Sequence, residues 1–308
     1  MSAAAKTFRK GSTGKQADLI FSRAALGSGI LILVILSGVS AFLIAQAIPA
    51  LIADPSKIEG GHGFGVYILP LVIGTLISVV IALLFATPVA MGIALFISHY
   101  APRKLSHALG YVIDLLAAIP SVVYGLWGWM ILAPAIQPIF AWLSDHLGFI
   151  PIFAGPVSTT GRTMLTAGLV LSVMVLPIIT SMTREIFLQT PKLHEEAALA
   201  LGATKWEMIR TAVFPYGKAG IISAIMLGLG RALGETMAIA MVLSPGSLNS
   251  SLVQTGNQTI AAEIALNFPE ASGVRMNTLI AAGLILFIIT LAVNMFARWI
   301  VARSGEKH

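Results

Sequence analysis

The chain has 308 residues, of which 57% are hydrophobic and only 10% are charged. A soluble globular domain carries roughly 25% charged residues, so this composition excludes an ordinary soluble protein and indicates a chain that folds in lipid. The net charge is +6, but the sequence lacks the basic helix or the aromatic-interleaved basic run that would favour nucleic acid as a partner. It also lacks cysteine, which excludes disulfides, thiolate metal sites and cysteine nucleophiles.

Six apolar segments predict an all-α membrane protein with six transmembrane helices, because each is long enough to cross a hydrocarbon core of ~30 Å. A basic tail, residues 1–23, precedes the membrane domain 24–303, and residues 304–308 follow it. The six expected helices cover about 24–52, 66–98, 108–135, 163–183, 219–243 and 276–300.

Two local features refine these expectations. Pro70 and Pro88 predict that the second helix bends or ends early, since proline lacks the N–H that a helix interior needs. Residues 136–150, with Trp142 among them, predict an interfacial segment outside the third helix.

The positions of the cations predict the orientation in the membrane. With the N-terminus inside, 15 of the 19 lysines and arginines lie on the inner side, and Lys57, Arg162 and Arg275 lie outside. Inner loops of membrane proteins carry such an excess of cations. We therefore expect a multi-pass protein of the cytoplasmic (inner) membrane with both termini in the cytoplasm.

The sequence offers no pattern for catalysis or for a cofactor. Residues 11–15, Gly-Ser-Thr-Gly-Lys, resemble a fragment of a phosphate-binding loop, but Arg9 stands where the first glycine is required. A flexible basic tail is the favoured interpretation, so we expect the chain to bind no ATP itself. No histidine pattern matches a metal site, and no nucleophile elbow or paired carboxylates are present. We therefore expect a non-enzymatic chain without metal or cofactor.

The longest inner connection, residues 185–218, is more than a simple loop. Thr190 can cap a helix whose first position is Pro191, and Gly202 suits the left-handed residue that ends it. Thr204 starts a capping box for a second short helix. Pro215 is expected to stop that second helix.

The first of these loop helices carries an apolar stripe. The stripe consists of Leu193, Ala197, Ala200 and Leu201. A solvated amphipathic hairpin would leave these side chains in water, so docking on another protein is the favoured interpretation.

The same helix carries recognisable residues. Glu196-Ala197-Ala198, three residues and then Gly202 resemble the EAA motif of ABC importer permeases, and Pro215 matches the proline that follows it, although Ala212 and Phe214 replace aliphatic residues. The resemblance implies a type I ABC importer permease-like bundle with a cytoplasmic coupling-helix loop that docks on an ATPase. The residues implied in ATPase coupling are Glu195, Glu196, Ala197, Ala198, Gly202 and Pro215.

A charge pair is expected inside the fifth helix. Arg231 lies roughly 18 Å along it, and Glu235 follows four residues later on the same helical face. A neighbouring stripe of Gly230, Gly234 and Ala238 would permit close helix packing. The pair could be a self-neutralising structural ion pair or a site that handles an anion, and the physical arguments divide evenly between the two.

A second resemblance bears on this choice. Residues 230–238, Gly-Arg-Ala-Leu-Gly-Glu-Thr-Met-Ala, are similar to a segment of PstC-like phosphate ABC transporter permeases, which are binding-protein-dependent inner-membrane components. Residues 118–125 resemble the same group. This similarity implies that Arg231 and Glu235 belong to the substrate pathway. Asp114 is expected to be an interfacial acid near the cytoplasmic face.

The resemblance also implies partners. These are a PstA-like sister permease, a PstB-like cytoplasmic ATPase dimer that binds the ATP, a PstS-like external phosphate-binding protein and membrane lipid, without nucleic acid. A permease for sulfate or molybdate, or the PstA-like subunit itself, remains an alternative. An ion channel or membrane enzyme is a different class, but a filter-like loop or a reactive cluster is not visible in the sequence.

Overall fold

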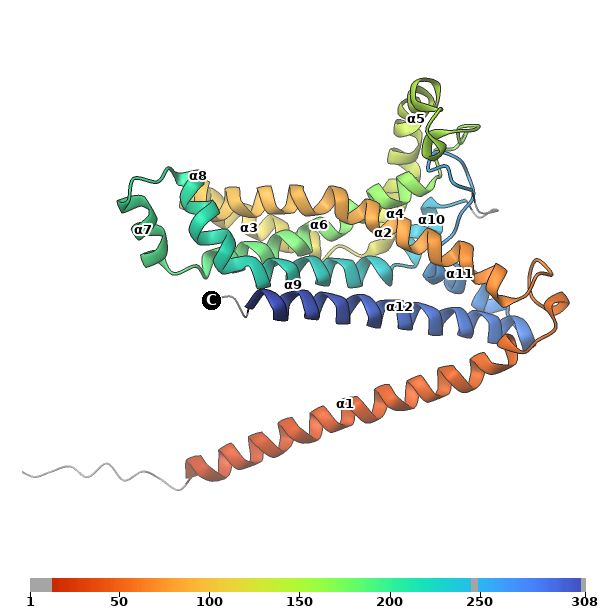
Figure 1. Ribbon diagram of the computed structural model, residues 1–308, viewed down its shortest axis with the longest axis horizontal. Helices are drawn as coiled ribbons and strands as arrows, with labels where there is room; N and C mark the ends of the chain where they lie inside the picture. The colour runs from red at the N-terminus through yellow and green to blue at the C-terminus, as the bar shows by residue number, and fades with distance from the viewer. Residues whose placement is uncertain (1–12, 245–248, 306–308) are drawn as a thin grey trace, which may run out of the picture.

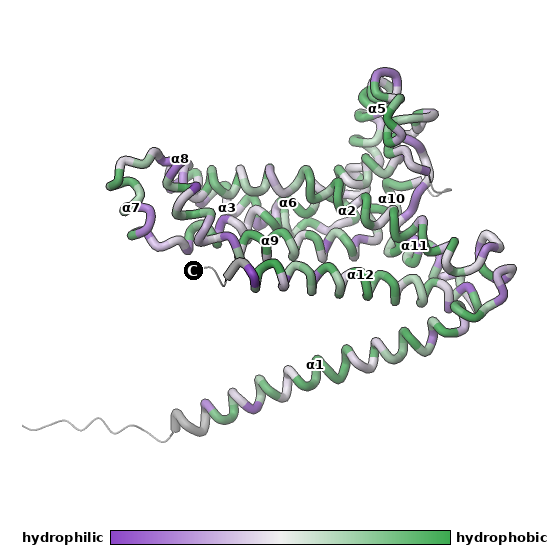
Figure 2. The backbone as a smooth tube through the Cα atoms, viewed as in Figure 1, coloured by the Kyte–Doolittle hydropathy of each residue, from purple (hydrophilic) through white to green (hydrophobic). Residues whose placement is uncertain are grey.

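The computed structural model describes residues 13–244 and 249–305, and every regular element within these ranges is helical. Six helical segments are long and apolar enough to cross a membrane, which confirms the expected number. They are Asp18–Leu51, Phe64–Tyr100, Ser121–Leu147, Met164–Leu188, Lys205–Leu233 and Gly273–Arg303. Figure 2 shows hydrophobic residues along the long helices and hydrophilic residues concentrated towards the two ends of the bundle.

The α-helices differ widely in length. In chain order they are α1 (Thr13–Leu51), α2 (Phe64–Leu95), α3 (Arg103–Ala117), α4 (Ser121–Trp127), α5 (Ala133–Leu147), α6 (Met164–Leu188), α7 (Lys192–Ala200), α8 (Lys205–Met208), α9 (Phe214–Leu233), α10 (Met237–Val242), α11 (Ile260–Asn267) and α12 (Gly273–Gly305). Three π-helical turns, Phe96–Tyr100, Gly128–Leu132 and Ile209–Val213, extend α2, join α4 to α5 and join α8 to α9.

The core of the bundle forms where α2 and α6 pack along each other, with α9 beside α6 (Figure 1). α2 presents the small buried side chains of Ala82, Ala86 and Ala90 to this contact. α6 supplies larger ones, including Leu171 and Val175, which are fully buried. Small residues on one helix let the neighbouring backbone approach closely, which is how helices gain packing energy when lipid surrounds them.

α1 lies outside this core. It packs mainly on α12, near its own C-terminal end, where Ala47 and Ala50 meet Ala281. Figure 1 shows the rest of α1 diverging from α12. Its apolar side chains are exposed all round, as expected for a helix whose solvent is lipid.

The third predicted helix, 108–135, differs from the structure. The chain leaves helical geometry between α3 and α4, at residues 118–120, because Pro120 has no N–H and disfavours helical geometry in the residue before it. The Tyr124 hydroxyl donates to the Leu116 carbonyl at 2.8 Å across this break. α5, which contains most of the expected interfacial segment, then turns away from the bundle (Figure 1).

The second helix does not end early, which corrects one of the two outcomes expected for it. α2 continues through both Pro70 and Pro88. Each proline removes one backbone hydrogen bond, and packing on neighbouring helices holds α2 together. Leu71, beside Pro70, packs against Ile260 and Ala282. The part of α2 at residues 79–90 packs against α6.

Both ends of the described chain lie at one end of the bundle. The start of α1, the end of α12 and the pair α7 and α8 gather there, while α5 and α11 lie towards the opposite end (Figure 1). This arrangement is the one required of a chain that crosses the membrane an even number of times.

Candidate functional site

The expected loop helix is present as α7, but its start was predicted wrongly. Thr190 does not cap it: the Thr190 hydroxyl is buried and has no hydrogen-bond partner among the residues that the structure describes. Pro191 occupies the cap position instead, and its carbonyl accepts from the His194 N–H at 3.0 Å. The extended backbone that precedes a helix is the geometry that proline and its neighbour adopt most readily.

The turn after α7 confirms two further predictions for this loop. Gly202 has a φ of +87°, in the left-handed region that favours glycine. The capping box that follows is complete: the Glu207 N–H donates to Thr204 Oγ1 at 3.3 Å, and the Thr204 N–H donates to Glu207 Oε2 at 2.7 Å. Both sides of the turn are therefore fixed by backbone geometry and hydrogen bonds.

Pro215 does not stop the second loop helix, contrary to the prediction. The helical run continues from Lys205 to Leu233 through the π-helical turn Ile209–Val213. In that turn the Phe214 N–H donates to the Ile209 carbonyl, five residues back. The wider turn accommodates a residue without an N–H, and π-helical turns are a recognised way for helices to absorb such an irregularity.

The side chains of α7 divide between the bundle and the outside. Ala198 packs against a buried cluster that includes Phe187 and Ile209. Glu195 lies 3.6 Å from Nε2 of His99 on the last turn of the second span. In contrast, Leu193 and Leu201 of the apolar stripe are 74% and 90% exposed.

The fifth helix is interrupted beside the expected charge pair. α9 ends at Leu233, Gly234 follows as its C-cap, and α10 begins only at Met237. Arg231 and Glu235 therefore do not share a helical face, which corrects the prediction. Glycine and threonine are weak helix formers, and the Glu235 carboxylate accepts from the Ala238 N–H at 3.1 Å, which stabilises the new helix start instead.

The two charged side chains also have different surroundings. Glu235 is buried, whereas Arg231 is exposed. Across residues 13–244 and 249–305 the ion pairs are His99–Glu195, Arg184–Glu185 and Arg275–Glu59, so Arg231 and Glu235 form none together. The self-neutralising pair is not the arrangement in this structure.

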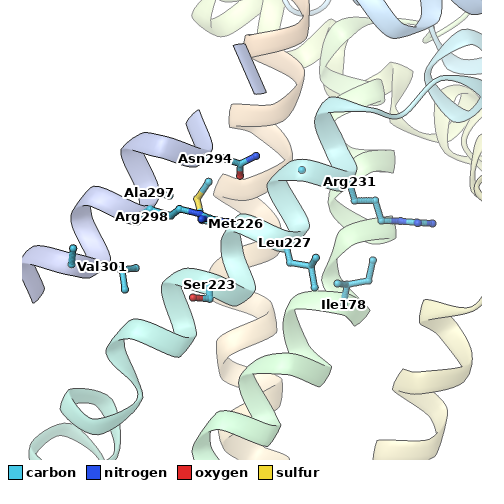
Figure 3. A pocket seen from close by; sticks show the side chains of 11 residues that line it. Ile178, Ser223, Met226, Leu227, Arg231, Asn294, Ala297, Arg298 and Val301 are labelled. Carbon is cyan, nitrogen blue, oxygen red and sulfur yellow. The ribbon is translucent and has the colours of Figure 1, made fainter. Parts of the chain in front are cut away.

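Arg231 lines a cavity of about 870 Å³ between α6, α9 and α12. The other polar side chains on its wall are Ser223, Asn294 and Arg298, and no carboxylate is among the lining residues. Figure 3 shows Asn294 and Arg298 reaching from α12 towards α9, and Arg231 extending from α9 on the side of Ile178. Two arginines therefore line the cavity, although the Arg231 side chain points away from Asn294 and Arg298 in this view. A guanidinium is a group that binds anions.

Sequence reasoning missed Asn294 and Arg298, although Asn294 is a conspicuous polar residue in an apolar run. It also misplaced part of the close packing in this region: Ala238 of the predicted stripe lies against Gly125, but, among the described residues, the two glycines of the stripe do not pack on another helix. Gly230 has open space around it, and Gly234 approaches only its own helix, whereas a Cβ on Gly228 would lie 2.7 Å from Ile179. Packing against α6 therefore occurs one helical face away from the predicted stripe.

The comparisons with known proteins agree with this architecture. The family described as binding-protein-dependent transport system inner membrane component matches residues 86–305. The "Phosphate transport system permease protein PstC 2" of Mycobacterium tuberculosis is 44% identical over 92% of this chain and 91% of its own length. PstC of Xylella fastidiosa strain Temecula1 is 45% identical over 76% of this chain and 73% of its own, and PstC of Mesorhizobium japonicum is 38% identical over 94% and 91%.

Solved structures support the same fold. A chain of the inward-facing MetNI methionine ABC transporter superposes with a TM-score of 0.54 at 16% identity, over 77% of this chain and 94% of that one. A chain of a bacterial alginate ABC transporter, solved in complex with an alginate pentasaccharide-bound periplasmic protein, gives a TM-score of 0.56 at 17% identity, over 96% and 98%. At such identities the likeness concerns the fold alone.

Proposed function

The chain belongs to the family of binding-protein-dependent transport system inner membrane components, and on that premise we propose that it is the PstC-like permease subunit of an ATP-driven phosphate importer. The observation that carries the proposal is its 44% identity with a phosphate transport permease over 92% of the chain. The six apolar helices make it a multi-pass membrane protein.

The distribution of cations supports a cytoplasmic location for the end of the bundle that bears α7, α8 and both termini. On this orientation the exposed stripe residues Leu193 and Leu201 face the cytoplasm, where an ATPase dimer would cover them. The ATPase binds the nucleotide, so this chain needs no cofactor and performs no catalysis of its own. A PstA-like sister permease completes the pathway, and a PstS-like protein delivers phosphate from outside.

A continuous path connects the α7 region to the membrane cavity. The turn at Gly202 and the capping box at Thr204 fix α7 to the start of the helical run 205–233. Arg231 lies near the far end of this run, immediately before the break at Gly234. A displacement of α7 by the ATPase would therefore move Arg231 through one helical run, in which the π-helical turn Ile209–Val213 joins α8 to α9.

Arg231 is the residue that we propose handles the anion. A guanidinium offers a planar fork of donors that matches two phosphate oxygens, and it stays charged at any physiological pH. Glu235 acts as a positioning residue, because its carboxylate holds the first turn of α10 rather than the arginine. The pathway role of Glu235 is thus indirect.

Uptake of radiolabelled phosphate tests the function. The chain is produced with its sister permease, ATPase and binding protein in cells that lack their own phosphate importers. We expect ATP-dependent accumulation of phosphate and none of labelled sulfate. Accumulation of sulfate or molybdate instead would assign the chain to another oxyanion, and accumulation of either anion without the ATPase would overturn the importer assignment.

A further inference from the structure

The end of the bundle that carries α7 contains a second cavity, of about 490 Å³, which shares no lining residue with the Arg231 cavity. It lies where the turn Phe96–Tyr100, α3, α6 and the start of α7 come together. Of these elements, α7 lies at one end of the molecule in Figure 1. Its charged lining residues are Arg103, His107, Asp114, Arg184 and Lys192.

Two of the three arginine and lysine side chains of this cavity have no protein partner of opposite charge. Arg103 and Lys192 are exposed and form no ion pair within residues 13–244 and 249–305, and neither does His107. The single acid, Asp114, accepts a hydrogen bond from the Ser181 hydroxyl at 2.8 Å. The cavity therefore has an excess of positive charge, even when Asp114 is ionised.

Arg184 provides a second, independent sign of a missing ligand. Its Nη2 pairs with Glu185 at 2.6 Å, and its guanidinium packs over Gly110 of α3, where a Cβ would collide with it. Its Nε is buried and has no hydrogen-bond partner among the described residues. Buried donors in proteins are almost always satisfied, and this unpartnered nitrogen belongs to a side chain that lines the cationic cavity.

We infer that this cavity binds a phosphate group at the cytoplasmic face, carried either by inorganic phosphate or by the headgroup of an anionic lipid. Arginine, lysine and a protonated histidine are the side chains that recognise phosphate oxygens. The volume exceeds that of one phosphate ion and leaves room for a glycerol headgroup. The site lies on the cytoplasmic side only if the proposed orientation holds, but binding itself does not depend on which solute the chain transports.

Such a ligand would act on the coupling helix directly. Lys192 is the first residue of α7, whereas Arg103 begins α3 and Arg184 lies on α6. Among the described residues, α7 has a polar contact with the bundle between Glu195 and His99, at 3.6 Å. A phosphate group shared by Lys192, Arg103 and Arg184 would hold α7 against the bundle and so restrict the element that meets the ATPase.

Thermal unfolding of the purified full-length chain in neutral detergent tests the site. One series adds inorganic phosphate against sodium chloride of equal ionic strength, and another adds phosphatidylglycerol against phosphatidylcholine. The test variant is Arg103→Gln/Lys192→Gln. The matched control, Arg210→Gln/Lys218→Gln, removes the same charge from exposed positions at the same end of the bundle but outside the cavity.

We expect the melting temperature of the wild type and of the control to rise by about 5 °C with saturating ligand, and that of the test variant to rise less than half as much. A rise with phosphate alone identifies the free ion, and a rise with phosphatidylglycerol alone identifies the lipid. Hydrogen exchange should slow in Lys192–Ala200 in the same sample. Equal melting-temperature shifts in the test and control variants, or no shift of the wild type with either ligand, would overturn the proposal. A wrong assignment of the transported anion would change the result of the uptake assay but would leave these melting-temperature shifts unchanged.

Discussion

Gly125 and Ala238 are in contact where the two segments that resemble phosphate permeases cross, and a Cβ on Gly125 would lie 2.8 Å from the Ala238 Cα. Gly125 lies on α4 and Ala238 on α10. Each of these short helices follows a break in a membrane segment, the first at residues 118–120 and the second at 234–236. The two irregular segments of the bundle therefore support each other through one close backbone contact.

Gly125→Val should destabilise the protein, because the added atoms cannot fit against the α10 backbone. Overpacking of this kind costs about 1–3 kcal/mol. Thermal unfolding in detergent measures the effect, and Gly230→Ala is the control because its Cβ would meet open space. We expect the control to be neutral or slightly stabilising, since alanine favours a helix more than glycine does. Equal losses in both variants would contradict a specific contact.

Gly202→Val should uncouple ATP hydrolysis from uptake. A β-branched residue at a φ of +87° is strained by roughly 1–2 kcal/mol, which would alter the angle between α7 and α8. The measurement is the number of ATP molecules hydrolysed per phosphate taken up by the reconstituted transporter. Gly202→Asn is the milder comparison, because asparagine tolerates the left-handed region. Unchanged coupling in the valine variant would mean that the turn does not transmit motion.

Single cysteines should report the proposed orientation, and the cysteine-free chain needs no preparation for them. Ser56 and Glu196 are both exposed and lie at opposite ends of the bundle. In intact cells, a membrane-impermeant maleimide should label Ser56→Cys and should reach Glu196→Cys only after the membrane is opened. The reverse pattern would invert the orientation.

Glu263 on α11 should make stability depend on pH. Burial raises the pKa of its carboxyl above the ordinary 4.5, and Glu59 adds to the effect, while the hydrogen bond from Tyr67 and the charge of Arg275 oppose it. The folded state therefore prefers the protonated acid. The stabilising contribution of protonated Glu263 is fully present below pH 4.5, the ordinary pKa, and is lost as the pH rises through the raised pKa of the folded state.

Glu263→Gln should flatten this dependence, because glutamine still accepts from the Tyr67 hydroxyl but does not ionise. Melting temperatures between pH 4.5 and 8 measure it. Glu270→Gln, at an exposed position on the same side of the bundle, serves as the control. If the melting temperature of the wild type instead rises across this range in parallel with that of Glu263→Gln, Glu263 is not the source of the pH dependence.

The sequence was sufficient to predict the number of membrane helices and the turn at Gly202, because both depend on local rules. Long apolar runs span a membrane, and a glycine between two helix-forming segments ends the first one. The breaks at Pro120 and Gly234 were missed, because their neighbours are apolar and the packing of α4 on α10 decides the geometry. Conversely, Pro215 was given too much weight as a helix breaker, and so was the early end of the second helix at Pro70 or Pro88.

The candidate cavity was only partly predictable. Arg231 was conspicuous as a charge in an apolar helix. Asn294 and Arg298 lie 63 and 67 residues further along the chain, and only the fold brings them to the same cavity. The prediction of an ion pair between Arg231 and Glu235 was wrong because it assumed that the helix continues through Gly234. Periodicity cannot reveal where a helix stops when its flanking residues remain apolar.

The most direct test of the account is phosphate uptake by Arg231→Gln at matched membrane abundance. Because Glu235 is held by the Ala238 N–H rather than by Arg231, this single substitution leaves no buried partner unpaired. Arg303→Gln is the matched control, since Arg303 lies over the ring of Trp299 on α12, outside the cavity.

We predict that Arg231→Gln assembles with its partners and melts within about 2 °C of the wild type, but loses at least ~90% of uptake, because the guanidinium that holds the anion is gone. Arg231→Lys should also be impaired, since it keeps the charge without the planar fork, and Arg303→Gln should transport normally. Full uptake by Arg231→Gln would contradict the account and leave Arg231 without a part in phosphate transport.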